Sequence, residues 1–425
     1  MEINQTKFEK IKTSMRVGYF LATRDIKQSN KWTTLLIMFV MTLTFLNLNV
    51  VSGILVGLIQ GSEEANKTHY TGDIIITPFL DRAYIEQSRD VEKIIETLPG
   101  YVAHTARYTE GGKVEENYRQ TLEPNQIISS ASGLVAGIDP IQEDKVTGLS
   151  TLIEEGSYLE PGDSNSILIG SSLLFKYTPV ESPGFQTLKD TTVGSKVKLT
   201  INGNQREFVV KGVVLSKVGD VDSRIYMLDS ELRKLIGRTD LNVDEIVVAL
   251  EDPSMADSAK AALIASGVGD VARVQTWIEA QPKFLKDIKV TFALLGNVIG
   301  SIGLAVASIT IFIVIFVNAI TRRRYIGILK GIGITKSAIL FSYVLQSLFY
   351  SFAGVGLGML IIFGFLKPFI AAHPINFPFS DGILVATISG TLIRAFILFI
   401  ATIIAGFIPA RIVIRQNTLS AILGR

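Results

Sequence analysis

The residues that could carry chemistry are few and widely separated in this sequence. His69, His104 and His373 lie far apart, and there is no cysteine to form a disulfide or to bind a metal as thiolate. Neither an HExxH nor a GxSxG motif occurs. Carboxylates are abundant between residues 61 and 289, but no spacing distinguishes a catalytic pair from a solvated acidic surface. We therefore expect a non-catalytic chain that binds no cofactor and no metal ion.

The stretch Gly327–Ser337, GILKGIGITKS, resembles a phosphate-binding loop only superficially. A Walker A motif requires a Gly immediately before its Lys and another Gly five positions earlier. Thr335 and Lys330 occupy those two places before Lys336. Any work driven by ATP therefore needs a second polypeptide, which would bind the ATP and the Mg²⁺.

Four long apolar runs are the elements on which any functional segment must be built. They span residues 33–60, 290–321, 337–366 and 383–410, and each exceeds the ~20 residues that a membrane-spanning helix needs. The run 290–321 has 32 uncharged residues, which is more than spanning requires. We expect four transmembrane helices, the first two of which extend beyond the bilayer as stalks. A simple tilt of two long helices is the alternative.

Charge is divided unevenly along the chain. Residues 61–289 carry 24 Lys/Arg and 35 Asp/Glu, a net charge of −11, whereas the remainder carries 17 Lys/Arg and 4 Asp/Glu, a net charge of +13. The basic residues outside that domain cluster in segments 1–32, 322–336 and 411–425, which the positive-inside rule assigns to the cytoplasm. The acidic domain 61–289 and the loop 367–382 would then lie outside. The pattern indicates a multi-pass protein in contact with membrane lipids and not with nucleic acid.

The domain 61–289 has an α+β pattern. Strand-like runs at 73–77, 133–138, 244–250 and 272–276 alternate with helix-like runs at 91–98 and 254–265. Segments 61–140 and 239–289 are therefore assigned to one α+β lobe, and 141–238 to an inserted β-rich lobe. Within the insert, Asn202-Gly203-Asn204 separates the runs 193–200 and 207–215 and predicts a β-hairpin.

Arg394 is the only ionisable residue inside a predicted span. Such a residue either faces protein or water and marks a functional position, or it snorkels toward the interface. Small residues at helical spacing follow two of the spans: Gly296, Gly300 and Gly303 in one, and the GxxxG pair Gly354 and Gly358 in the other. They indicate close helix packing, either within the chain or at a dimer seam.

The segment Arg322–Lys336 is short, basic and apolar-patterned. A helix here would present one apolar face made of Tyr325, Ile326, Ile328, Leu329 and Ile332. Gly327, Gly331 and Gly333 lower helix propensity but allow a partner's backbone to approach closely. A docked motor domain could push such a helix. A basic topogenic loop without a partner is the alternative.

Residues 322–333, RRRYIGILKGIG, resemble the R-x-x-E-I-G-I-L-[RK]-x-x-G signature of FtsX-like ABC transporter permeases, the family of the MacB, LolC/LolE and FtsX transmembrane subunits. The C-terminal IPARIVIRQNTLSAILGR resembles the family's closing pattern, with Pro409, Ala410, Arg411, Ala421 and Leu423 matching. The N-terminal segment resembles the family's amphipathic helix on the inner leaflet. The order of one helix, a large domain and three helices also agrees.

The resemblance implies a site and several partners. The residues implied to contact an ATPase are Tyr325, Ile326, Gly327, Ile328, Leu329, Lys330, Gly331 and Gly333. It implies a porter-like outer domain and a permease dimer, homomeric or heteromeric, in the bacterial inner (cytoplasmic) membrane. A cytoplasmic ABC ATPase would drive motion of the stalks and the outer domain, a mechanism termed mechanotransmission.

The same resemblance implies export or extraction of a lipoprotein, lipid, peptide or amphiphile, with a periplasmic adaptor or a lipoprotein as a further partner. Tyr325 stands where the family usually has an acid, so a charge-assisted contact is missing there. Two other functions remain open. One is a signalling complex that activates an external partner such as a cell-wall hydrolase, and the other is a membrane-anchored receptor without a motor.

Overall fold

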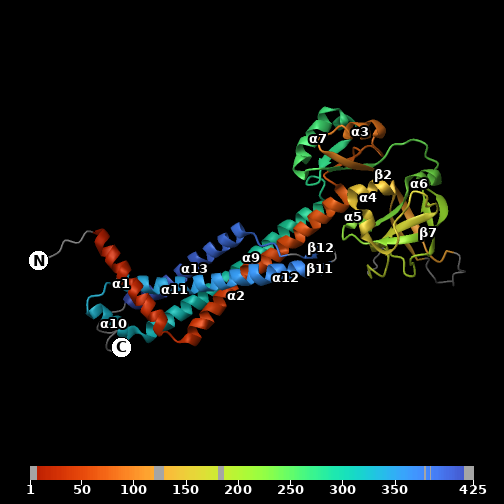
Figure 1. Ribbon diagram of the computed structural model, residues 1–425. Coiled ribbons are helices and arrows are strands. Elements are labelled where there is room, and N and C mark those ends of the chain that lie inside the picture. Colours follow the sequence, from red (N-terminus) through yellow and green to blue (C-terminus); the bar gives the residue numbers. More distant parts are fainter. Residues whose placement is uncertain (1–6, 119–128, 180–185, 378–379, 383, 416–425) are drawn as a thin grey trace. The chain divides into compact units, whose positions relative to one another are not determined.

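The structure is a computed structural model that describes residues 7–118, 129–179, 186–377, 380–382 and 384–415 (Figure 1). It divides into two compact units. The helical unit comprises Met1–Ile59, Asp287–Asn376 and Asp381–Arg425, and the sheet unit comprises Gln60–Lys286 and Phe377–Ser380. The predicted motif positions Ala421 and Leu423 lie outside the described residues.

Long helices form most of the helical unit. In chain order the helices are α1 (Lys7–Gln28), α2 (Lys31–Asn66), α9 (Lys283–Thr321), α10 (Arg323–Gly331), α11 (Lys336–Ile361), α12 (Lys367–Ala372) and α13 (Ile388–Arg415), and a π-helical turn, η5 (Ile362–Leu366), joins α11 to α12. Among the described residues, four stretches are long and apolar enough to cross a membrane: Lys31–Thr71, Lys283–Thr321, Lys336–Ala372 and Ile388–Arg415. Each of the four predicted apolar runs falls on one of them. A short hairpin of β11 (Ile375–Phe377) and β12 (Ser380–Gly382) precedes α13.

The bounds near the last helix differ from those expected. The run predicted from residue 383 becomes helical only at Ile388, because Thr387 caps α13 by accepting the Gly390 N–H at Oγ1 (3.2 Å). Just before it, Val385 donates its N–H to the carbonyl oxygen of Gly53 (3.1 Å), which holds the chain against α2. Conversely, the predicted loop 367–382 starts as helix α12, which continues η5 without a break and contains Pro368 in its first turn.

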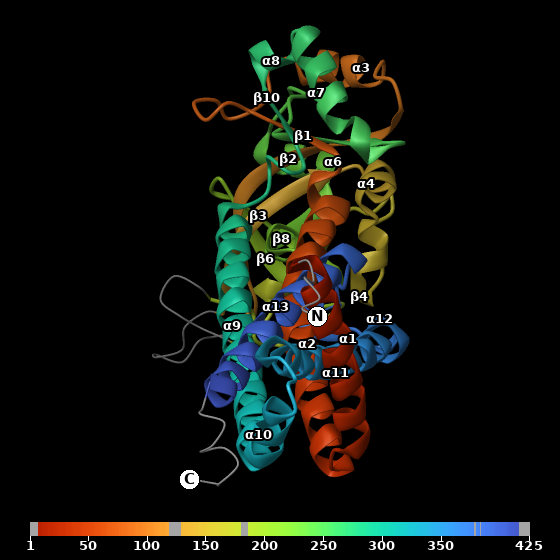
Figure 2. The same cartoon turned by 90° about the vertical axis from the view of Figure 1, so that its left-hand side faces the viewer.

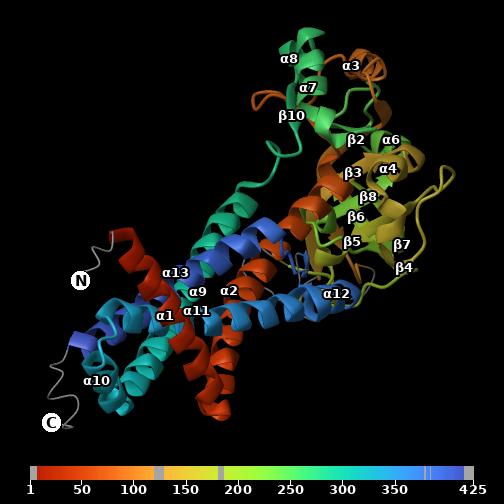
Figure 3. The same cartoon turned by 60° about the vertical axis from the view of Figure 1, so that its left-hand side comes forward.

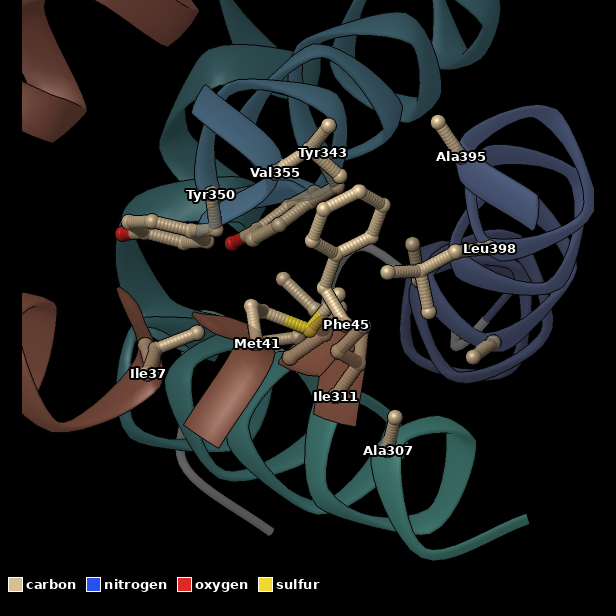
Figure 4. Packing of buried hydrophobic residues seen from close by; sticks show 14 of the residues in the cluster. Ile37, Met41, Phe45, Ala307, Ile311, Tyr343, Tyr350, Val355, Ala395 and Leu398 are labelled. Carbon is tan, nitrogen blue, oxygen red and sulfur yellow. The ribbon is translucent and has the colours of Figure 1, made fainter. Parts of the chain in front are cut away.

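Glycines bring the helices of this unit into close contact. A Cβ at Gly354 or Gly358 of α11 would lie 2.4 Å from Met41 Cβ or from Phe45 Cδ1 of α2. Met41 and Phe45 are fully buried, and Figure 4 shows Phe45 beside Leu398 of α13. The α9 glycines also face α2: Gly296 meets Ser52, Gly300 meets Leu48 and Gly303 meets Asn47. Of the two explanations for these small residues, the structure supports packing within the chain.

The described part of the sheet unit contains ten strands. They are β1 (Ile74–Thr77), β2 (Tyr101–Glu115), β3 (Ser130–Ile138), β4 (Ile153–Gly156), β5 (Ser166–Gly170), β6 (Lys196–Ile201), β7 (Asn204–Val214), β8 (Arg224–Leu228), β9 (Glu245–Leu250) and β10 (Arg273–Thr276). Their order is β10-β1-β9-β2-β3-β8-β5-β7-β4, with β6 paired to β2 and β7. The helices of this unit that the argument uses are α3 (Ser88–Ile95), α4 (Pro140–Thr147), α6 (Asp229–Ile236), α7 (Ala256–Ala265) and α8 (Val268–Val271).

Strand β2 is shared between two lobes. Its first half, Tyr101–Arg107, pairs with β9, and its second half, Tyr108–Glu115, pairs with β3. The first lobe packs α3, α7 and α8 against β1, β9 and β10, as Figure 2 shows. The second lobe holds β3 to β8 and α6 around a separate buried cluster. One 15-residue strand therefore joins the two hydrophobic cores.

The division into lobes corrects one prediction. The strand expected at 133–138 was assigned with segment 61–140 to the first lobe, but β3 pairs with the second half of β2 and runs parallel to β8. The boundary therefore lies inside β2 and not near residue 140. The predicted hairpin is confirmed: β6 and β7 flank Asn202 and Gly203, whose positive φ values of 48° and 82° suit a type I′ turn.

Candidate coupling site

The segment predicted to couple to an ATPase is the helix α10. Helix α9 ends at Thr321, Arg322 leaves helical geometry, and a new helix runs from Arg323 to Gly331. It ends in a Schellman motif: Ile334 donates its N–H to the Leu329 carbonyl oxygen (3.0 Å), and Gly333 donates to that of Lys330 (3.2 Å). Gly333 has φ +92°, a conformation that favours glycine, so its role is to end the helix.

The apolar residues of α10 divide between two faces. Ile326 and Leu329 are 3% and 8% exposed and join the core of the helical unit. Tyr325, Ile328 and Ile332 point away from that core and are 39%, 47% and 71% exposed. The single apolar face expected from the sequence is therefore wrong, because a helix advances about 100° per residue and separates positions 325, 328 and 332 from 326 and 329.

The two glycines of α10 differ in burial. Gly327 is buried with Ile326, whereas Gly331 is exposed and a Cβ there would meet nothing within 4 Å. The exposed stripe of Tyr325, Ile328 and Ile332 with Gly331 beside it is called here the outward face of α10. It is an apolar strip on a helix whose opposite side is fixed in a core.

Lys330 brings the two predicted family motifs together. Its Nζ donates a 3.0 Å hydrogen bond to the carbonyl oxygen of Ile414, near the C-terminal end of α13, where the helix dipole favours a cation. Burial, and then the charge of Lys336, lower the pKa of Lys330. The Pro409-Ala410-Arg411 motif lies inside α13, with Pro409 and Ala410 buried and Arg411 exposed. Lys330 therefore joins the end of α10 to the end of α13.

A second attachment of α10 was not predicted from the sequence. Arg322, the residue before α10, pairs with Asp25 of α1 at 2.7 Å between Nη1 and Oδ1. Gln346 of α11 donates from Nε2 to the other Asp25 oxygen, Oδ2 (3.1 Å). Burial raises the pKa of the Asp25 carboxyl, and the Arg322 guanidinium offsets part of that effect. A small polar recess here is lined by Asp25, Ser29, Asn318, Arg322, Tyr343, Gln346 and Tyr350.

The N-terminal helix α1 is packed along α11. A Cβ at Gly18 would lie 2.7 Å from the Ala338 carbonyl oxygen, and Ser14 Oγ lies 3.1 Å from Thr335 Oγ1. Asp25 is one of four acidic residues outside 61–289, and that scarcity is a signal in the sequence that could have pointed to it. Helices α1, α10 and α11 thus meet at one ion pair.

Arg394, the intramembrane charge, is directed at protein. It is half-buried, and its Nη1 lies 3.5 Å from Oδ1 of Asn49 on α2. Asn49 is 1% exposed and its Nδ2 also donates to the Phe45 carbonyl oxygen (2.9 Å). Of the two alternatives for Arg394, the structure supports the inward-facing one.

Two solved structures are similar to part of this chain. The periplasmic region of MacB from Actinobacillus actinomycetemcomitans aligns with 51% of this chain and 97% of its own length, at 16% identity and a TM-score of 0.34. The extracellular domain of the noncanonic ABC-type transporter YknZ from Gram-positive bacteria aligns with 48% of this chain and 98% of its own, at 13% identity and a TM-score of 0.31.

Two sequence comparisons also give matches. The lipoprotein-releasing system transmembrane protein LolC of Neisseria meningitidis serogroup B (strain MC58) is 22% identical over 273 residues, which are 59% of this chain and 64% of the relative. The model of the FtsX-like permease C-terminal region matches residues 297–418, the segment that contains α10. Residues 297–418 of this chain are therefore similar to the C-terminal region of FtsX-like permeases.

Proposed function

We propose that this chain is the permease subunit of an ABC transporter and that its ATPase is a separate polypeptide docked on the outward face of α10. ATP and Mg²⁺ would bind to that partner. Hydrolysis would displace α10, and the stalks α2 and α9 would carry the motion to the sheet unit. The cargo would be a lipoprotein, lipid, peptide or amphiphile, and two permease copies would form the membrane part.

The orientation follows from charge. Segments 1–32, 322–336 and 411–425 carry most of the basic residues outside the acidic domain, so the N-terminus, α10 and the C-terminus would lie in the cytoplasm of a bacterium. The sheet unit, inserted between α2 and α9, would lie outside the inner membrane. Length supports the stalk arrangement, since α9 has 39 residues and ~20 suffice to span the bilayer.

The observation that carries the proposal is the division of α10 into two faces. Ile328 and Ile332 are exposed and do not belong to the buried cluster of the helical unit. Burying such a side chain in a partner's groove contributes about 1.5–3 kcal/mol. Tyr325, which replaces the family's usual acid, would contribute ring contact in place of a charge-assisted bond.

The test is to place a charge on the outward face. Ile328→Asp should leave membrane insertion unchanged but weaken ATPase binding by about tenfold or more, because a carboxylate would be buried at the contact. The control is Ile264→Asp in the sheet unit, where Ile264 is 48% exposed. The measurement is the amount of ATPase that co-purifies from the native host in mild detergent.

Equal recovery of the ATPase with Ile328→Asp and with wild type would contradict the docking proposal. The signalling alternative makes a different prediction for the intact complex. In that case ATP hydrolysis would raise the activity of an external hydrolase without releasing any lipid or lipoprotein from the membrane.

A further inference from the structure

A cluster of buried charges in the sheet unit has no role in the function described so far. Four ionised side chains form it: Arg107 of β2, Glu143 of α4, Arg224 of β8 and Glu245 of β9. Arg107 Nη2 lies 2.7 Å from Glu143 Oε1, and Arg107 Nη1 lies 3.2 Å from Glu245 Oε2. Arg224 Nη2 lies 2.7 Å from Glu245 Oε1. All four residues are buried, and their charges cancel.

Tyr70 lies at the centre of this cluster. Its hydroxyl donates to Glu245 Oε1 (3.2 Å) and accepts from Arg224 Nη2 (3.0 Å), and Arg107 Nη1 donates to its carbonyl oxygen (3.1 Å). The guanidinium carbons of Arg107 and Arg224 lie 5.4 and 4.9 Å from the centre of its ring. The group of Tyr70, Arg107, Glu143, Arg224 and Glu245 is called here the ion cluster.

The ion cluster joins both lobes to the segment that continues α2. Glu245 comes from the first lobe, Arg224 from the second, and Arg107 from the strand that they share, where it pairs with Glu245 in register. Tyr70 belongs to η1 (Lys67–Thr71), a π-helical turn that directly follows α2. Figure 3 shows α4, which supplies Glu143, beside this end of α2.

The turn η1 is held rigidly on both sides of Tyr70. His69 Nδ1 lies 2.9 Å from the carbonyl oxygen of Thr147 in α4, and Lys67 pairs with Asp73 at 3.3 Å. Gly72 follows with φ +58°, and a Cβ there would lie 2.7 Å from the Val248 carbonyl oxygen. These contacts place η1, and with it the end of α2, against α4 and the strands. π-Helical turns recur at functional positions, and this one sets the direction of the Tyr70 ring.

A buried network of this kind is expensive unless every partner is in place. Each ion loses its water, and only good geometry recovers that loss. Although burial alone would raise it, the pKa of Glu245 is lowered to about 2 by Arg224 and Arg107, so the carboxylate stays ionised. An apolar core would join strands at less cost. Unlike an apolar core, the ion cluster fixes the orientation of the elements that it joins, because its directional bonds resist sliding and rotation.

We propose that Tyr70 is a positioning residue that locks the end of α2 to both lobes, so that displacement of α2 moves the whole sheet unit as one body. This inference rests on the proposed function and specifies where the stalk delivers its motion. Without the Tyr70 ring and hydroxyl, α2 would still move but would turn beneath the strands.

The chain offers a closely matched control. Tyr108 is also buried, its hydroxyl donates to Glu110, and the guanidinium carbons of Arg233 and Arg238 lie 4.8 and 4.1 Å from its ring. It belongs to the second lobe and has no contact with η1 among the described contacts. Tyr70→Phe and Tyr108→Phe therefore remove the same chemical group from the same kind of site, but only one of the two adjoins α2.

The experiment uses the full permease–ATPase complex in lipid nanodiscs. Because the chain has no cysteine, Asn204→Cys and Arg415→Cys can be spin-labelled alone, one in each unit. The distance between the labels is measured without nucleotide and with ATP and vanadate. In the wild type we expect the distance to shift. With Tyr70→Leu we expect ATP hydrolysis to persist and the shift to vanish, and with Tyr70→Phe we expect a reduced shift. Tyr108→Phe should shift as the wild type does.

The outcomes separate the two proposals. A full shift in both Tyr70 variants overturns the role of Tyr70 and leaves the permease function standing. No shift in the wild-type complex overturns the proposed function, and this inference with it. If Tyr70→Leu fails to fold, judged by Trp277 fluorescence, Tyr70→Phe decides alone: a reduced shift with native fluorescence supports the lock, and a full shift overturns it. A purely structural role would lower ATP hydrolysis and the shift together.

Discussion

At the scale of single residues, two neighbouring carboxyl groups in the sheet unit have pKa values that are shifted in opposite directions. Asp244 and Glu245 are adjacent at the start of β9, and both are nearly buried. Burial raises the pKa of Asp244 to about 6, although it accepts hydrogen bonds from Thr109. Glu245 has its pKa lowered to about 2, since its two arginine partners outweigh burial. Partner charges, and not burial alone, decide the state of each group.

Asp244 makes the stability of the sheet unit depend on pH. Its pKa is higher in the folded state than the ordinary value of 3.8, so the folded state binds the proton more tightly and loses stability as pH rises through about 6. Wild type should gain about 1 kcal/mol from this group between pH 7 and pH 5. Asp244→Asn should remove that gain. Urea unfolding followed by Trp277 fluorescence in a Trp32→Phe background measures it, and an unchanged pH difference in the variant would refute this assignment.

Asp25 is the residue-scale attachment of the coupling helix. Asp25→Asn keeps the shape but removes the charge facing Arg322, so the free energy of unfolding of the helical unit should fall by about 1 kcal/mol, a modest value because Arg322 is partly exposed. Detergent-driven unfolding followed by circular dichroism is the measurement. Lys27→Gln, an exposed change on the same helix, is the control. Equal stability of the two variants would argue against a structural role for the ion pair.

At the scale of elements, close approach of α11 to α2 organises the helical unit. Gly354 and Gly358 leave no room for a side chain, whereas Gly356 between them faces open space. The three glycines look alike in the sequence, and only helical spacing separates them. The unit therefore contains its own matched test of which glycines matter.

Gly358→Ala should destabilise the packing of α2 on α11 by about 1–3 kcal/mol, because the new methyl group would overlap the Phe45 ring. Gly356→Ala should be neutral or slightly stabilising, since alanine favours helix and nothing lies near. Both are compared by the detergent concentration at which helicity is lost. A Gly356→Ala variant as unstable as Gly358→Ala would show that helix propensity and not α2 contact sets the effect.

Much of the fold could be predicted from local patterns in the sequence. Apolar runs predicted the four long helices, and Asn202-Gly203 predicted the β6–β7 turn, because both depend on neighbours in the sequence. Pairings between distant residues were not predictable in this way. Asp25 and Arg322 are 297 positions apart, and Arg107 and Glu245 are 138 apart. The assignment of β3 to the wrong lobe has the same cause, because the residues of a strand do not determine by themselves which strand it pairs with.

The coupling site shows the same limit in one helix. Sequence alone located α10 and its apolar residues, but not which of them the helical core would take. Ile326 and Leu329 belong to the buried cluster of the helical unit, whose other members come from distant parts of the chain such as α2, α11 and α13. The other apolar side chains, Tyr325, Ile328 and Ile332, stay exposed and form the outward face.

At the scale of the whole molecule, the proposed function is the transmission of motion from the helical unit to the sheet unit. In this proposal the motion starts at the outward face of α10, where the ATPase docks. It reaches the sheet unit at the ion cluster, which adjoins the end of α2. Ile326 and Leu329 pack the inner side of α10 into the helical core, and Lys330 bonds to α13. A force applied to the outer side of α10 would therefore be transmitted to the helical core. In the proposed function the energy comes from an ATPase that touches α10.

The most direct measurement of that claim is photo-crosslinking from the outward face in living cells. A photoreactive amino acid at Ile332, which is 71% exposed, is compared with one at Ile404 of α13, which is 54% exposed and is expected to face lipid. We predict that the probe at Ile332 forms an adduct with a cytoplasmic ATP-binding protein and that the probe at Ile404 does not. An Ile332 probe that reacts only with lipid, or with a protein outside the membrane, would contradict the account.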